Sequence, residues 1–193
     1  MKQDVTPTAP RHHRAGTADK RIMFYSHDTF GLGHLRRSRA LATALTQSDP
    51  SASAIILTGS PVAGRFTFPE RVDHIRLPGV TKLTDGSYIS QTLGMGIDET
   101  TSLRAGIIQT AIEQYEPDLM IVDKEATGFR GELLPTLEWL NLRGRTKLVL
   151  GLRDVLDEPD VLAAEWERKA AIPAIEKFYG EIWVYGMRDV YDP

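Results

Sequence analysis

Six short apolar runs, separated by segments with helical periodicity, constrain the fold of this chain more than any other feature. Each run is bounded by turn residues, as the buried strands of a parallel sheet are. The runs cover residues 22–25, 54–58, 72–77, 119–122, 147–152 and 181–185. This alternation predicts an α/β fold with a doubly wound, mostly parallel, six-stranded Rossmann-like sheet in the strand order 3-2-1-4-5-6.

The segments between the runs carry apolar residues at the spacing of amphipathic helices. Helices are expected over residues 34–45, 62–66, 98–115, 131–142 and 159–178, the last broken at Pro173. The connection over residues 80–97 is unusually long and contains three glycines. Its length leaves two interpretations open, a functional or mobile loop and a hairpin packed on the edge of the domain.

The turn after the first strand, residues 26–33, is dense in chemically useful side chains. Gly31 and Gly33 allow positive φ and a close approach of the backbone to a ligand. The N–H groups and dipole of the following helix favour an anion there. Neither the full dinucleotide fingerprint nor the Walker pattern is present. A tight connection that binds nothing is the alternative interpretation.

Polar residues also follow three other strands. Ser60 follows the second strand, Asp123 and Lys124 follow the fourth, and Arg153 follows the fifth. Because the carboxyl ends of parallel strands share one edge of the sheet, this edge is predicted to face the ligand. An ion pair or helix cap is the alternative role for Arg153 and its neighbour Asp154.

Bulk composition excludes several classes of protein. The 193-residue chain has a net charge of -3 and no cysteine. No global positive field therefore favours nucleic acid, and disulfides and thiolate sites are excluded. No apolar run approaches the length of a membrane span. Residues 1–20 are polar, so we expect them to form a disordered tail that is not a secretory signal. A cytoplasmic location is therefore expected.

Four segments carry a resemblance to a known family. They read YSHDTFGLGHLRRSRALA from Tyr25, IVDKEATGFRGELLPTLEWL from Ile121, LVLGLRDVLDEPD from Leu148, and WVYGMRDVYDP from Trp183. The chain resembles bacterial predicted glycosyltransferases of the two-domain GT-B superfamily, which are similar to the peptidoglycan lipid-intermediate GlcNAc transferase.

The resemblance implies two Rossmann-like domains facing a cleft. Residues 21–185 would be the N-terminal, acceptor-side domain, and residues 186–193 would begin the interdomain linker. A C-terminal domain outside this chain would hold most of a nucleotide-sugar donor, so this domain alone would be inactive. The activity implied is transfer of a sugar to an acceptor hydroxyl of unknown identity. No metal or other cofactor is implied, and peripheral membrane contact is possible for such a protein.

The resemblance and the residue chemistry both select His34 as the expected general base, since histidine most often fills that role. Asp28 or Asp123 would orient it, although Asp28 is equally suited to forming the turn. Arg36 and Arg37 would contact diphosphate, and the alternative is that one of them is simply solvated, since adjacent helical residues cannot share a face. The simpler alternative for His34 is a helix-start residue donating to a carbonyl.

The expected catalytic residues are thus His34 and Asp28. The expected substrate-binding residues are Gly31, Gly33, Arg36, Ser60, Asp123, Lys124 and Arg153. Two other functions stay open. A nucleotide-sugar hydrolase would use water in place of the acceptor, and a ligand-binding module would not need His34 for catalysis.

Overall fold

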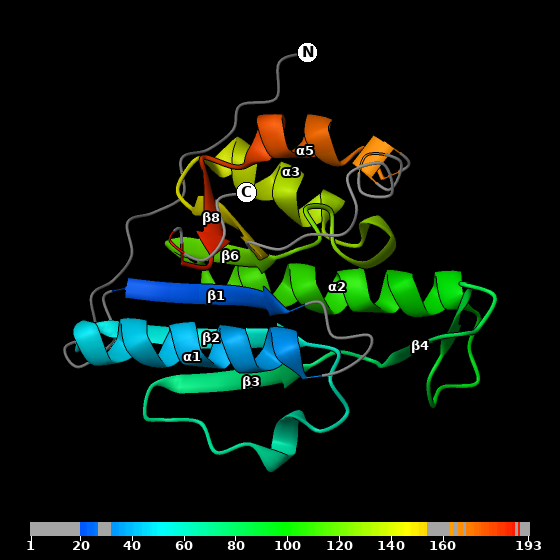
Figure 1. Ribbon diagram of the computed structural model, residues 1–193, viewed down its shortest axis with the longest axis horizontal. Helices are drawn as coiled ribbons and strands as arrows, with labels where there is room; N and C mark the ends of the chain where they lie inside the picture. Colours follow the sequence, from blue (N-terminus) through cyan, green and yellow to red (C-terminus); the bar gives the residue numbers. More distant parts are fainter. Residues whose placement is uncertain are drawn as a thin grey trace.

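A computed structural model describes residues 20–26, 32–153, 163, 166–167, 169–187 and 189. Within them, six parallel strands form one sheet with helices on both faces (Figure 1). The strand order is β3-β2-β1-β6-β7-β8, which is the predicted order 3-2-1-4-5-6 once the strands of a separate small hairpin are set aside. The expected doubly wound, Rossmann-like fold is confirmed.

The six strands match the six apolar runs closely. They are β1 (Lys20–Ser26), β2 (Ala52–Thr58), β3 (Val72–Arg76), β6 (Leu119–Asp123), β7 (Lys147–Arg153) and β8 (Glu181–Tyr185). All five neighbouring pairs are parallel. Lys20, assigned above to the tail, is the first residue of β1 and pairs with Ala52. The rest of the expected tail, residues 1–19, lies outside the described residues.

Burial on both faces explains why the central strand is apolar without alternation. Phe24 of β1 packs in a cluster with Leu35 of α1 (Gly33–Ser48). Met23, one position earlier, faces the opposite side and packs with helices α2 (Ile97–Tyr115), α3 (Leu134–Arg143) and α5 (Ala171–Phe178). Successive strand residues point to opposite faces, so covering both faces requires a continuous apolar run.

The long connection contains a hairpin, the second of the two interpretations left open. Its antiparallel strands are β4 (Val80–Lys82) and β5 (Tyr88–Ser90), and Lys82 pairs with Tyr88. The predicted short helix after β2 is a 3-10 turn, η1 (Ala63–Arg65). The hairpin places Tyr88 near the loop that follows β6.

Two helix predictions need correction. The chain after β6 first forms the 3-10 turn η2 (Phe129–Gly131), and α3 begins only at Leu134, because Gly131 adopts a positive φ that ends the turn. Pro173 does not break α5, since it lies in the first turn of that helix. A proline is tolerated there because its missing N–H has no helical acceptor.

A buried ion pair links the helical layer to the central strand. The guanidinium of Arg104 in α2 donates from Nε to Oε2 of Glu132 at 2.6 Å and from a terminal nitrogen to Oε1 at 2.6 Å. Tyr25 of β1 donates to the same carboxylate at 2.7 Å, and its Oη accepts the N–H of Phe129 at 2.8 Å. The group ties β1, α2 and the β6–α3 loop together.

Buried phenols make stability sensitive to alkali. Burial raises the pKa of Tyr25, Tyr115 and Tyr179, and raises the pKa of Tyr185 to about 12. The stability contributed by these neutral phenols is fully present below the unfolded pKa of about 10, and is lost as the pH rises through that value toward the folded pKa values.

We therefore expect the free energy of unfolding to fall above about pH 10, with phenolate absorbance appearing together with unfolding. The measurement is urea unfolding across alkaline pH with ultraviolet absorbance recorded in parallel. Simple titration of every tyrosine near pH 10 in a protein that stays folded would contradict this.

Candidate functional site

A histidine–aspartate pair lies at the carboxyl edge of the sheet. His34 is the second residue of α1, and Asp123 is the last residue of β6. Nδ1 of His34 lies 2.9 Å from Oδ2 of Asp123. The Asp123 side chain is 4% exposed, whereas that of His34 is 20% exposed. The buried carboxylate thus orients an imidazole that remains partly open to solvent.

Arg37 also binds this aspartate. It lies one helical turn after His34, and its guanidinium donates to Oδ1 of Asp123 at 3.2 Å. The two carboxylate oxygens therefore contact different side chains of the same helix. Arg36, the arginine preferred from the sequence, is exposed, and the two arginines point in different directions as adjacent helical residues must.

Tyr185 completes the surroundings of the pair. The Arg37 guanidinium lies 5.2 Å from the centre of its ring. Burial and the Asp123 carboxylate raise the pKa of Tyr185 to about 12, although Arg37 acts in the opposite direction. The phenol rests on Gly151 of β7, where an added Cβ would come within 2.2 Å of the hydroxyl. The missing side chain of Gly151 therefore makes room for Tyr185.

The other predicted site residues are more scattered. Gly33 is the first residue of α1 and is not among the residues with positive φ, so the left-handed backbone expected there is not adopted. Lys124 follows Asp123 directly and has a φ of 66°. Arg153 is the exposed last residue of β7. Asp28 and Gly31 lie outside the described residues.

Ser60 lies two residues beyond β2 and is 1% exposed. Its buried Oγ has no hydrogen-bond partner among the described residues. The Ser60 hydroxyl therefore makes no hydrogen bond to His34 or Asp123, whereas Arg37 contacts both Asp123 and the ring of Tyr185.

The geometry assigns chemical roles to the two ring nitrogens of His34. A carboxylate can only accept, so the contact with Asp123 favours a proton on Nδ1. Nε2 is then the nitrogen with a lone pair that can accept a proton from a ligand. Asp123 would also stabilise the imidazolium that results. With this tautomer, the pair presents a proton-accepting ring nitrogen whose partner nitrogen is held by a buried carboxylate.

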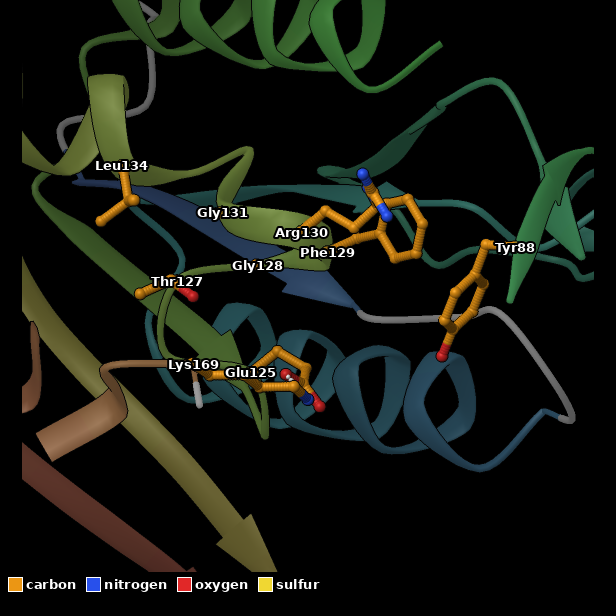
Figure 2. Close-up of a pocket in the computed structure, with 9 residues that line it drawn as sticks. All are labelled: Tyr88, Glu125, Thr127, Gly128, Phe129, Arg130, Gly131, Leu134 and Lys169. Atoms are coloured by element: carbon orange, nitrogen blue, oxygen red, sulfur yellow. Dashed lines mark hydrogen bonds and ion pairs between the residues drawn. The ribbon is translucent and has the colours of Figure 1, made fainter. Parts of the chain in front are cut away.

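A pocket of about 480 Å³ lies along the chain that follows β6 (Figure 2). It is formed mainly by the β6–α3 loop, with Tyr88 contributed by the β4–β5 hairpin and Lys169 by the chain before α5. Its lining residues are Tyr88, Glu125, Thr127, Gly128, Phe129, Arg130, Gly131, Leu134 and Lys169. Glu125 N–H donates to the carbonyl of Asp123 at 2.8 Å, so a tight turn joins the pair to the pocket.

The pocket loop requires glycine at position 128. Gly128 has φ 72° and ψ -178°, a region that side chains exclude, and an added Cβ would lie 2.6 Å from Cγ of Leu133. Strain and overpacking together should make Gly128→Ala destabilising by about 2–4 kcal/mol in urea unfolding.

Gly106→Ala is the matched control, because an added Cβ there meets nothing within 4 Å and the site is helical. It should be neutral or stabilising by about 0.5–1 kcal/mol. Equal effects of the two substitutions would show that the loop tolerates a side chain at position 128.

Two structural features are absent from the described residues. In this part of the chain, no group of three histidine, aspartate or glutamate side chains is placed to hold a metal ion. None of its helices combines the length and the apolar character needed to cross a membrane.

Comparisons with known proteins leave the family open. No protein-family model matches the sequence, and no curated protein matches it. Functional assignment therefore depends on the chemistry of the residues and on the resemblance of the four segments.

Proposed function

We propose that this chain is the acceptor-side domain of a glycosyltransferase in which His34 is the general base. The observation that carries the proposal is the 2.9 Å contact between His34 Nδ1 and Asp123 Oδ2 at the carboxyl edge of the sheet. Ligands of open α/β sheets bind at that edge. The Gly-x-Gly-His segment, which resembles that of the GT-B superfamily, supports the same assignment.

The reaction would proceed by displacement at the anomeric carbon. Nε2 of His34 takes the proton of an acceptor hydroxyl as its oxygen forms a bond to that carbon. The bond from the anomeric carbon to the nucleoside diphosphate breaks, and its electron pair leaves with the diphosphate. A second domain supplies the donor in this proposal.

Asp123 and Arg37 would support the base without touching the reacting atoms. Asp123 orients the imidazole and stabilises its charged form as the proton arrives. Arg37 holds the other carboxylate oxygen at 3.2 Å and so limits rotation of the Asp123 side chain. Both are therefore positioning residues in this mechanism.

The tautomer of His34 can be tested on this chain alone. We expect ring nitrogen resonances of ¹⁵N-labelled protein to show neutral His34 protonated on Nδ1, because Asp123 accepts from that nitrogen. Asp123→Asn should shift the population toward the other tautomer. His74, which stacks on Phe68, is the internal control whose resonances should not respond. Protonation of wild-type His34 on Nε2 would remove the base assignment.

The activity is tested on the full product of the gene that encodes this chain. Purified protein is incubated with a panel of nucleoside-diphosphate sugars, with and without methyl glycosides as acceptors, and nucleoside diphosphate release is measured. Release that depends on an acceptor and yields a disaccharide supports transfer. Release of free sugar without an acceptor would indicate a hydrolase, and no release with any donor would favour a binding module.

A further inference from the structure

The pocket on the β6–α3 loop presents an unusual combination of groups. Glu125, buried at its wall, accepts from Lys169 Nζ through Oε2 at 2.7 Å (Figure 2). The second oxygen, Oε1, makes no hydrogen bond to any described residue. Glu125 Oε1 is not among the buried atoms that lack a partner, so it is open to the pocket and can accept a hydrogen bond from a ligand.

Thr127 adds a second polar group without a protein partner. The residue is 7% exposed, and its hydroxyl makes no hydrogen bond to other described residues. Figure 2 shows this hydroxyl directed into the pocket, on the same side as Glu125. A threonine hydroxyl both donates and accepts, as an alcohol ligand requires. The pocket lining therefore offers two groups, the Glu125 carboxylate and the Thr127 hydroxyl, that can hydrogen-bond to a ligand.

The opposite wall is aromatic. Tyr88 of the hairpin packs edge-on against Phe129, with ring centres 4.9 Å apart and planes at 73°. This contact holds the Tyr88 ring at the rim, and Figure 2 shows both rings across the pocket from Glu125. An aromatic wall facing polar groups suits a ligand that has an apolar face and a hydroxyl-bearing edge.

The charges of the pocket discriminate among ligands. The Glu125 carboxylate would repel a phosphate or carboxylate, and its pairing with Lys169 offsets the attraction that the ammonium would otherwise exert. Arg130, at the rim, is paired with Asp98 at 2.6 Å. A neutral ligand rich in hydroxyl groups therefore fits better than an anion.

We propose that this pocket binds a neutral pyranose ring, and that this ring is the hydroxyl-bearing end of the acceptor. That the ring belongs to the acceptor rests on the proposed function, whereas binding of a pyranose ring in the pocket does not. Hydroxyl groups of the ring donate to Glu125 Oε1 and exchange hydrogen bonds with Thr127, and its apolar face lies on Tyr88. A tight turn joins Glu125 in the pocket lining to Asp123, the residue that contacts the base.

The test is a titration of the ¹⁵N-labelled chain with methyl glycosides of glucose, galactose, mannose and N-acetylglucosamine. Inorganic phosphate and glucose 6-phosphate are the anionic comparison probes. We expect at least one neutral glycoside to shift the amide resonances of Gly128 and Gly131 in a saturable manner. The anions should bind more weakly at these amides.

Variants separate pocket binding from general effects. Thr127→Val preserves the shape of the side chain and removes the hydroxyl, so it should weaken binding about tenfold, as should Glu125→Gln. Glu138→Gln is the control, because Glu138 pairs with Lys177 outside the pocket. Amide spectra of each variant report whether the fold is retained.

The outcomes are distinct from those of the transfer assay. Absence of saturable shifts with every glycoside, tighter binding of an anion, or unchanged affinity in Thr127→Val would each overturn the pocket proposal. Glycoside binding in a protein that never transfers sugar would retain the pyranose site and reject the proposed function. Sugar transfer that requires His34, in a protein whose pocket binds no glycoside, would retain the proposed function and reject the pyranose site.

Discussion

Glu132→Gln should lower the free energy of unfolding by about 3–5 kcal/mol, the usual effect of removing one member of a buried ion pair. Glu132 is fully buried and is bound by Arg104 through two hydrogen bonds of 2.6 Å. The amide preserves the size of the side chain but leaves the buried guanidinium without a countercharge. Tyr25 also loses the charged acceptor of its hydroxyl.

Urea unfolding of the chain measures this effect directly. Glu116→Gln is the matched control, because Glu116 pairs with Arg143 at 3.4 Å in a much more exposed position. The control should change stability by less than about 1 kcal/mol. Replacing both buried partners, in Arg104→Met with Glu132→Leu, should cost less than Glu132→Gln alone. A Glu132→Gln protein as stable as the control would show that the pair is not critical to the fold.

His34→Ala should lower turnover about 100-fold or more in the full gene product, the low end of what a general base contributes. The reason is the loss of the proton acceptor that Asp123 orients. Affinity for the nucleotide-sugar donor should change little, because in the proposed function another domain holds most of the donor.

The measurement is turnover together with donor binding, with His74→Ala as the control. His74 is likewise a partly buried histidine beside an aspartate, but it lies in β3 and 3.7 Å from Asp73. Its replacement should leave turnover unchanged. Unchanged turnover in His34→Ala would remove the base assignment, and lost donor binding in a folded protein would make His34 a phosphate-binding residue.

The order of the sheet was predictable because each strand corresponds to a short apolar run that can be recognised in the local sequence. The run over residues 22–25 is apolar without alternation, and β1 is buried on both faces. Connections through helices then force parallel, right-handed crossovers. Local signals were weaker for the helix starts, since the delayed start of α3 depends on the backbone of Gly128 and Gly131.

The site was only partly predictable, because its contacts join residues far apart along the chain. Asp123 was one of two candidates to orient His34, and its place beside the start of α1 depends on the pairing of β1 with β6. Arg37 was named beside Arg36 as a diphosphate contact but was left out of the expected binding residues, since which of the two faces the site depends on what the helix packs against. Nothing in the sequence indicated that Tyr185 belongs to the site, because the position of its side chain depends on the space left by the missing side chain of Gly151.

Glu132 shows the same limit in the core. Nothing in the local sequence pattern around Glu132 indicated a buried carboxylate. Glu132 and its partner Arg104 are separated by 28 positions and meet only when α2 packs beside the β6–α3 loop. The pocket groups Glu125 and Lys169, which are 44 positions apart, were missed for the same reason.

A double-mutant cycle on turnover tests most directly whether His34 and Asp123 act as one unit. His34→Ala, Asp123→Asn and the double variant are compared with the unmodified full gene product. If Asp123 works through His34, Asp123→Asn lowers turnover in the presence of His34, and the double variant is no slower than His34→Ala alone. Turnover losses that simply multiply in the double variant would contradict a shared role for the pair.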